Sequence, residues 1–112
     1  MSQEERQNKK VQELQILEQQ KQIFLMEKQS VQVELNEVNN ASDELKKTDD
    51  EVYKILGGIM IRTNKNVLIQ ELNEKQRVLN IRISAFEKQE KLIEEKINKI
   101  RSEVVSLMKE EK

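Results

Sequence analysis

The chain contains only two glycines, Gly57 and Gly58, and they are adjacent near the middle of a 112-residue sequence without proline. Glycine adopts the positive φ that a tight reversal requires, whereas proline would interrupt a long helix. The sequence therefore predicts one reversal at this pair, with an uninterrupted arm on each side.

Composition favours long helices over a compact globular fold. Apolar residues make up 36% of the chain and charged residues 37%, with one Tyr and two Phe. This supply of large apolar side chains is too small for a thick core. Glu, Lys, Gln, Leu and Ile dominate, which is typical of a coiled coil.

Several functional classes are disfavoured by the residue types. The chain has no Cys and no His, so thiol chemistry and the commonest general base and metal ligand are missing. Its 20 basic and 21 acidic residues give a net charge of −1, which provides no electrostatic footprint for nucleic acid. No apolar run is long enough for a membrane span, and the first ten residues are polar. We therefore expect a cytoplasmic protein that is not an enzyme, needs no cofactor or metal, and binds neither nucleic acid nor membrane.

Both arms carry apolar residues at heptad spacing, which predicts two helices that pack against each other. The stripe of the first arm is Leu17, Phe24, Val31, Val38 and Leu45. The stripe of the second arm is Leu72, Leu79, Phe86, Ile93, Ile100 and Leu107. Because the chain reverses between them, the arms should form an antiparallel two-helix coiled coil.

One antiparallel register satisfies both stripes. It pairs Leu45 with Ile69, Leu35 with Leu79, Val31 with Ile83, Leu17 with Ile97 and Leu14 with Ile100. The same register places Glu90 between Lys21 and Lys28 in neighbouring layers. We expect this charge cluster to help fix the register.

The period changes around the glycines. Residues 52–56 and 59–63 read as short strands that the glycine pair joins into a β-hairpin. Either Thr63 or Asn64 caps the second helix. An isolated hairpin is marginal in water, and a low-charge apolar one is prone to aggregate, so we expect it to assemble with other chains. The expected assembly residues are Val52, Tyr53, Ile55, Leu56, Gly57, Gly58, Ile59, Met60 and Ile61.

The far ends of the arms have apolar residues without apolar partners in this register. Val104 faces Lys10 and Leu107 faces Gln7, and Val105 and Met108 lie beside them. Fraying without a role is one interpretation; a binding surface is the other, and the position at the ends of both arms favours it. Outside the seam, a further apolar group either contacts another subunit or binds clients: Ile16, Ile23, Leu25, Met26 and Val33.

Two other motifs are interpreted as incidental. Residues 48–51 (Thr-Asp-Asp-Glu) include three acidic residues but lack the spacing and glycine of a calcium loop, so we interpret them as a solvated helix end. Residues 40–42 match a glycosylation sequon, but they lie in a heptad helix of a chain without a signal peptide.

A family resemblance rests on the segment from Val52 to Arg62, VYKILGGIMIR, followed by VLIQEL at 67–72 and FEKQE at 86–90. With a single hairpin between two matched arms, the sequence resembles the β-type subunit of prefoldin. The likeness extends from about residue 10 to about residue 110. The resemblance implies that the chain is one prefoldin-like unit, 1–112, with helices over 8–48 and 65–110 and a hairpin over 52–63.

The resemblance implies a mainly α fold whose hairpin joins an intersubunit β-barrel. It implies a hexamer of two α-type and four β-type subunits that holds unfolded polypeptides without ATP and delivers them to a group II chaperonin. Assembly then falls on residues 52–63. Client contact falls on the ends of the arms: Val11, Leu14, Leu17, Val104, Val105, Leu107 and Met108. The alternative is a structural coiled-coil adaptor or filament subunit.

Overall fold

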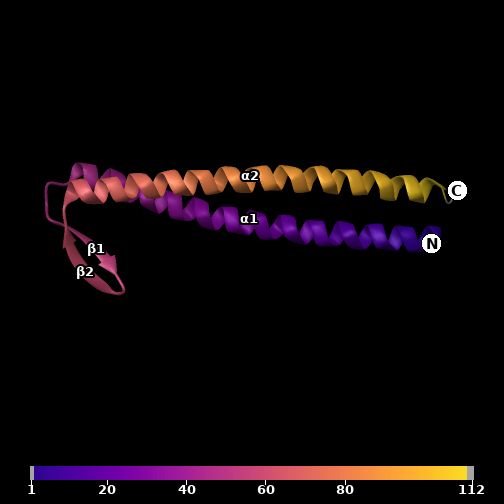
Figure 1. The fold of residues 1–112 in the computed structure, drawn as a ribbon, viewed down its shortest axis with the longest axis horizontal. Helices are drawn as coiled ribbons and strands as arrows, with labels where there is room; N and C mark the ends of the chain where they lie inside the picture. The colour runs from indigo at the N-terminus through magenta and orange to yellow at the C-terminus, as the bar shows by residue number, and fades with distance from the viewer. Residues whose placement is uncertain (1, 111–112) are drawn as a thin grey trace. The chain divides into compact units, whose positions relative to one another are not determined.

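A computed structural model describes residues 2–110 as two long helices with a hairpin between them (Figure 1). The elements in chain order are α1 (Gln3–Lys47), β1 (Val52–Leu56), β2 (Ile59–Thr63) and α2 (Lys65–Glu110). This is the mainly α architecture that the sequence predicts. Within the described residues, neither helix has a stretch sufficiently long and apolar to cross a membrane.

Helix α1 begins at Gln3 rather than at residue 8 because a capping motif precedes it. The backbone N–H of Glu5 donates to Ser2 Oγ at 3.1 Å, which satisfies one of the free donors of the first turn. The helix ends at Lys47. There, Lys65 Nζ donates to the carbonyl oxygen of Thr48 at 2.8 Å and places a positive charge at the negative end of the helix dipole.

The hairpin turns at the glycine pair, as predicted. Strands β1 and β2 are antiparallel, and Leu56 and Ile59 are the last paired residues before the turn. Gly57 has φ 55° and Gly58 has φ 79°. Two successive positive φ values are the requirement of a type I′ turn, which matches the twist of the strands beside it.

Helix α2 starts with Asn64 as its cap. Asn64 Oδ1 accepts a hydrogen bond from the backbone N–H of Asn66 at 2.8 Å. Thr63 is the last residue of β2, where it pairs with Val52. The structure thus resolves the choice between Thr63 and Asn64 in favour of Asn64.

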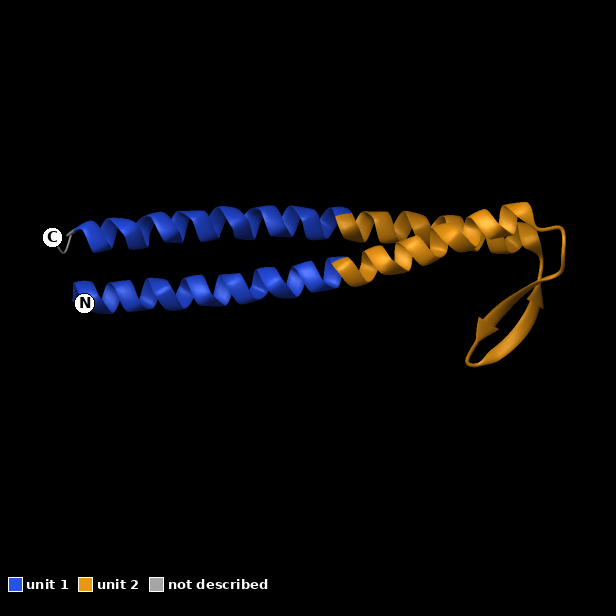
Figure 2. Ribbon diagram, turned by 180° about the vertical axis from the view of Figure 1, so that it is seen from behind, with its two compact units in different colours: residues 1–28, 84–112 blue, residues 29–83 orange. Residues whose placement is uncertain are grey.

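The chain divides into two compact units, which Figure 2 colours separately. Unit 1 contains residues 1–28 and 84–112, and unit 2 contains residues 29–83. Each unit thus includes a part of α1 and a part of α2, and unit 2 also includes the hairpin.

Unit 2 has a continuous buried seam between its two helical parts. Its buried apolar side chains are Val31, Leu35, Val38, Leu45, Leu79 and Ile83, and Ser42 is buried with them. Lys75 Nζ lies 3.2 Å from Glu34 Oε1, and Gln76 Nε2 donates to Asn39 Oδ1 at 2.7 Å. The helical parts are therefore antiparallel, and the layers predicted for Val31 with Ile83 and Leu35 with Leu79 consist of buried residues.

Unit 1 has a thinner apolar seam. Ile93 and Ile97 are its buried apolar residues among those described. Phe24 and Phe86 are half-buried, and their rings pack with centroids 6.4 Å apart at an interplanar angle of 48°. Such a tilted aromatic pair stabilises the contact beyond the area that it buries.

Candidate binding surfaces

The hairpin exposes apolar side chains on both of its faces. Ile55 is 71% exposed, and Ile59 and Met60 are each 65% exposed. Tyr53, Leu56 and Ile61 are also exposed, and Val52 is half-buried. We call the nine residues predicted for assembly the hairpin surface. A sheet built from several chains would bury these apolar side chains and pair the two open edges of the hairpin.

Glu51 ties the two strands together at the base of the hairpin. Its carboxylate accepts a hydrogen bond from Tyr53 Oη at 2.7 Å and lies 2.7 Å from Arg62 Nη2. Tyr53 and Arg62 are direct partners in the ladder. The hydrogen bond to Glu51, with a smaller effect of burial, raises the pKa of the Tyr53 hydroxyl above its usual value. The acidic segment 48–51 therefore contributes to the hairpin.

A groove of about 680 Å³ lies between the hairpin and the helical parts of unit 2. Leu45, Leu68 and Leu72 line it from the helices, and Ile55 and Leu56 line it from β1. Lys54 Nζ reaches both carboxylate oxygens of Glu71, at 3.0 and 3.3 Å, and so links β1 to α2. Sequence reasoning did not identify Leu68 or this groove, because both depend on where the hairpin lies relative to the helices.

The residues predicted at the ends of the arms all belong to unit 1. We call Val11, Leu14, Leu17, Val104, Val105, Leu107 and Met108 the end surface. Val105 is 50% exposed and Met108 57%, and Val11 is also exposed. Leu14, Leu17, Val104 and Leu107 are half-buried in the seam. The structure thus brings these residues into one unit and leaves part of their apolar surface open to solvent.

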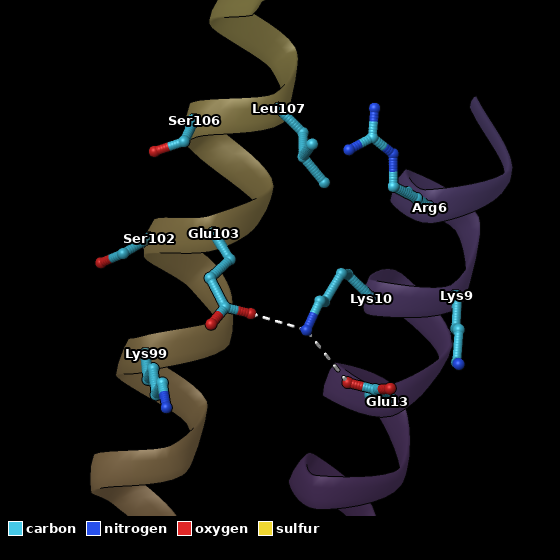
Figure 3. A pocket seen from close by; sticks show the side chains of 9 residues that line it. All are labelled: Arg6, Lys9, Lys10, Glu13, Lys99, Ser102, Glu103, Ser106 and Leu107. Carbon is cyan, nitrogen blue, oxygen red and sulfur yellow. Dashed lines mark ion pairs between the residues drawn. The ribbon is translucent and has the colours of Figure 1, made fainter. Parts of the chain in front are cut away.

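A cleft of about 770 Å³, lined mainly by charged residues, opens beside this surface, between α1 and α2 in unit 1. We call it the charged cleft. Figure 3 shows Lys10 between Glu103 and Glu13, with its Nζ 2.8 Å from Glu103 Oε2 and 3.8 Å from Glu13 Oε2. The hydrogen bond with Glu103 raises the pKa of Lys10, and the same bond lowers the pKa of Glu103. Both groups therefore stay charged at neutral pH and connect the two helices.

Further ion pairs join the helices of unit 1 and correct one detail of the predicted charge cluster. Lys28 Nζ lies 3.3 Å from Glu90 Oε1, as the register requires. Lys21 was expected beside Glu90 as well, and this is wrong, because Lys21 Nζ lies 2.7 Å from Glu94 Oε2. Glu94 follows Ile93, the residue that the register places opposite Lys21, so the pairing changes the predicted charge cluster but not the register.

The structure also shows the exposure of the remaining residues that the sequence singles out. Ile16, Ile23, Met26 and Val33 are exposed, and Leu25 is half-buried. Asn40 and Ala41 are exposed on α1, whereas Ser42 is buried. Within residues 2–110, no group of acidic side chains has a geometry that would hold a metal ion.

The helix–hairpin–helix arrangement has known counterparts. The family model described as "Prefoldin subunit" matches residues 8–111. The chain belongs to the prefoldin subunit family. The match includes the hairpin and nearly all of both helices, so the resemblance stated from the sequence is confirmed.

Relatives within the prefoldin family carry the β designation. The prefoldin β subunit of Thermococcus kodakarensis is 35% identical over 58 residues, which is 52% of this chain and 50% of the relative. The prefoldin β subunit of Methanococcus maripaludis gives 35% identity over 52% of this chain and 51% of the relative. The chain thus aligns with about half the length of these curated relatives.

Solved prefoldin structures have the same fold. The crystal structure of the prefoldin β subunit from Thermococcus strain KS-1 is 34% identical, covers 90% of each chain and gives a TM-score of 0.84. The β2 subunit from the same strain is 20% identical and has a TM-score of 0.73, which is a likeness of fold. The predicted fold class is therefore confirmed.

Proposed function

We propose that the chain is a β-type prefoldin subunit that acts as an ATP-independent holdase for unfolded polypeptides. Membership of the prefoldin family is the observation that carries this proposal, because prefoldin is a family of chaperones. The end surface supports it, since Val11, Val105 and Met108 expose apolar side chains near the ends of both helices. Non-native chains expose apolar segments that such a surface can bind reversibly.

Assembly is assigned to the hairpin surface. Its exposed apolar side chains and unpaired edges favour burial in a β-barrel formed with other prefoldin subunits. We propose a hexamer of two α-type and four β-type subunits, in which residues 1–112 act as one functional unit. Several weakly binding end surfaces in one assembly would act together and raise the affinity for a client.

The proposed cellular role is to pass the held client to a group II chaperonin in the cytoplasm, without cofactor or catalysis. A structural coiled-coil adaptor is the second candidate. The observation that favours it is the exposed row on the outer side of α1, formed by Ile16, Ile23 and Met26, which a folded helical partner could cover.

The two candidates are separated by removing most of the end surface, all but Leu14 and Leu17, while keeping the hairpin. A variant that lacks residues 1–13 and 102–112 retains the hairpin surface and the buried seam of unit 2. We expect its assembly with an α-type prefoldin subunit to have the subunit count of the full-length assembly in native mass spectrometry. We also expect it to lose suppression of light scattering by a heat-denatured client.

The matched control replaces Leu92 and Ile81 with Ser. Both are exposed apolar residues of α2 outside the end surface. This variant should keep both assembly and suppression. Full suppression by the truncated variant would contradict the assignment of client contact to the end surface, and failure of the full-length assembly to suppress aggregation would contradict the holdase itself.

A further inference from the structure

We propose that the charged cleft of unit 1 binds acidic segments of polypeptide, and so gives the subunit a second, electrostatic contact with its clients. This proposal rests on the proposed holdase function for its biological setting. The peptide binding that it asserts can be measured separately.

The charges that line the cleft are unbalanced. Arg6, Lys9, Lys10 and Lys99 supply four positive charges and Glu13 and Glu103 two negative ones, so the local sum is +2. The whole chain has a net charge of −1. The cleft is therefore a local positive region on a chain that is close to neutral, and such a region attracts carboxylates.

Lys10 is occupied by the carboxylates of the cleft itself, but other cations are available. Lys10 pairs with both Glu13 and Glu103 (Figure 3). Arg6, Lys9 and Lys99 have no ion pair within the described residues. They come from both helices, so a ligand in the cleft would meet positive charge from either wall. The Lys10–Glu103 pair connects these walls.

The cleft and the exposed apolar residues lie on different faces of the helices. On α2, Lys99, Ser102, Glu103 and Ser106 follow the spacing of a single helix face. Val105 and Met108 share another face and do not line the cleft. The end of unit 1 therefore offers a charged face and an apolar face to the same polypeptide.

The composition of the cleft favours an acidic peptide over nucleic acid. A phosphate backbone carries a charge on every nucleotide, so nucleic acid in the cleft could not keep all its charges away from Glu13 and Glu103. A peptide can place its carboxylates near Arg6, Lys9 and Lys99 and away from these two glutamates. Leu107 adds an apolar contact at the end of the cleft where Arg6 lies (Figure 3).

The test is fluorescence anisotropy of a labelled twelve-residue peptide of Glu, Ser and Gly, titrated with the full-length chain in its assembled form. A matched peptide with Gln in place of Glu reports contacts that need no charge. We expect the acidic peptide to bind more tightly, and its binding to weaken in 0.5 M salt because the contacts are exposed.

The variant Lys9→Gln with Lys99→Gln should weaken binding of the acidic peptide about tenfold, since two exposed charge contacts are lost. The control variant Lys88→Gln with Lys109→Gln removes the same charge from exposed positions outside the cleft and should bind as the unmodified chain does. Equal affinity of the cleft variant and the unmodified chain would overturn the proposal. So would an equal loss in both variants.

A twelve-nucleotide oligothymidine serves as competitor. Weak or absent competition is expected, and competition stronger than that of the unlabelled acidic peptide would overturn the assignment to polypeptide. Suppression of aggregation is measured on the same samples with a client that lacks acidic segments. If the unmodified assembly binds the acidic peptide but suppresses no aggregation, the holdase proposal fails while the cleft proposal stands. If suppression is intact and peptide binding is absent, the cleft proposal fails while the holdase proposal stands.

Discussion

The two units of the chain use the same pair of helices but hold them together differently. In unit 2 the seam is a row of buried aliphatic side chains from Val31 to Leu45 on α1, with Leu79 and Ile83 on α2. In unit 1, Ile93 and Ile97 are buried, and ion pairs such as Lys10–Glu103 and Lys21–Glu94 join the helices. Buried apolar area stabilises far more than exposed ion pairs do. Unit 2 should therefore be the stable part, and unit 1 the part that opens easily.

This difference matches the proposed division of labour. A unit that assembles through its hairpin needs a fixed geometry, which a buried apolar seam supplies. A surface that binds many non-native segments gains from local opening, since low-stability regions adapt to different ligands.

Replacement of Gly57 and Gly58 with Val should abolish assembly. Open space surrounds both positions, so the obstacle is the backbone, whose φ values of 55° and 79° are unfavourable for a β-branched residue. The strain amounts to about 1 to 3 kcal/mol at each position, enough to disrupt a hairpin that is marginal by itself. Native mass spectrometry should detect no hexamer, while circular dichroism should retain strong helical signal. An unchanged hexamer would contradict the role of the hairpin.

Leu79→Ala should destabilise unit 2 strongly. Leu79 is 2% exposed, so its truncation leaves a cavity in the seam and costs about 3 kcal/mol of unfolding free energy. Urea unfolding of the assembled chain measures the change. The control is Leu92→Ala on the same helix, where a 57% exposed side chain is removed at little cost. Equal losses for the two variants would contradict the claim that the stability of the chain depends on the buried seam.

Ser42→Ala should stabilise unit 2. Ser42 is 2% exposed, and its hydroxyl has no hydrogen-bond partner within residues 2–110. Removal of a buried unpaired hydroxyl gains about 1 kcal/mol, and Ala also favours helix. Ser30→Ala is the control, because Ser30 lies exposed in the same helix and reports the helix preference alone. A gain no larger than that of the control would indicate that Ser42 Oγ is satisfied, for example by water.

The fold was predictable because it depends on local patterns. The glycine pair, the switch in period at Val52 and the heptads each determine an element without knowledge of its neighbours. The paired layers of unit 2 follow from the same stripes. The identity of the cap, Thr63 or Asn64, was not predictable. It depends on where strand β2 ends and on which side chain accepts a hydrogen bond from the backbone N–H of Asn66.

The candidate sites were predictable only in part, for a different physical reason. Sequence periodicity identifies the residues of a seam, but it does not identify partners on the flanks, as the pairing of Lys21 with Glu94 shows. The charged cleft joins Lys9 and Lys99, which lie far apart in the sequence and belong to no motif. Likewise, Leu68 lines its groove only because the hairpin and the helices of unit 2 together enclose it. Both features depend on tertiary placement of exposed side chains, which no local pattern encodes.

The smallest expected effect concerns pH and unit 1. Hydrogen bonds with Lys21 and Lys10 hold the pKa values of Glu94 and Glu103 below the ordinary 4.5. At a pH between these lowered pKa values and 4.5, the unfolded chain binds protons more readily than the folded chain does. The stability that these carboxylates supply is thus present above about pH 4.5 and is lost as the pH falls through their folded pKa values.

The variant Glu94→Gln with Glu103→Gln tests this pH dependence through thermal midpoints measured by circular dichroism. At pH 7 its midpoint should lie slightly below that of the unmodified chain, and the difference should shrink as the pH falls from 4.5 through the lowered pKa values of the two carboxylates. Glu74→Gln is the control from unit 2, because Glu74 pairs with Arg77 on its own helix and so does not join α1 to α2. Amide hydrogen exchange of the α1 and α2 residues in unit 1 gives a second measurement. An equal change in both variants would show that the ion pairs of unit 1 do not hold these two helical parts together. We expect amide exchange in unit 1 to increase only in the Glu94 and Glu103 variant. Because few side chains of unit 1 are buried, these ion pairs supply a larger share of its stability.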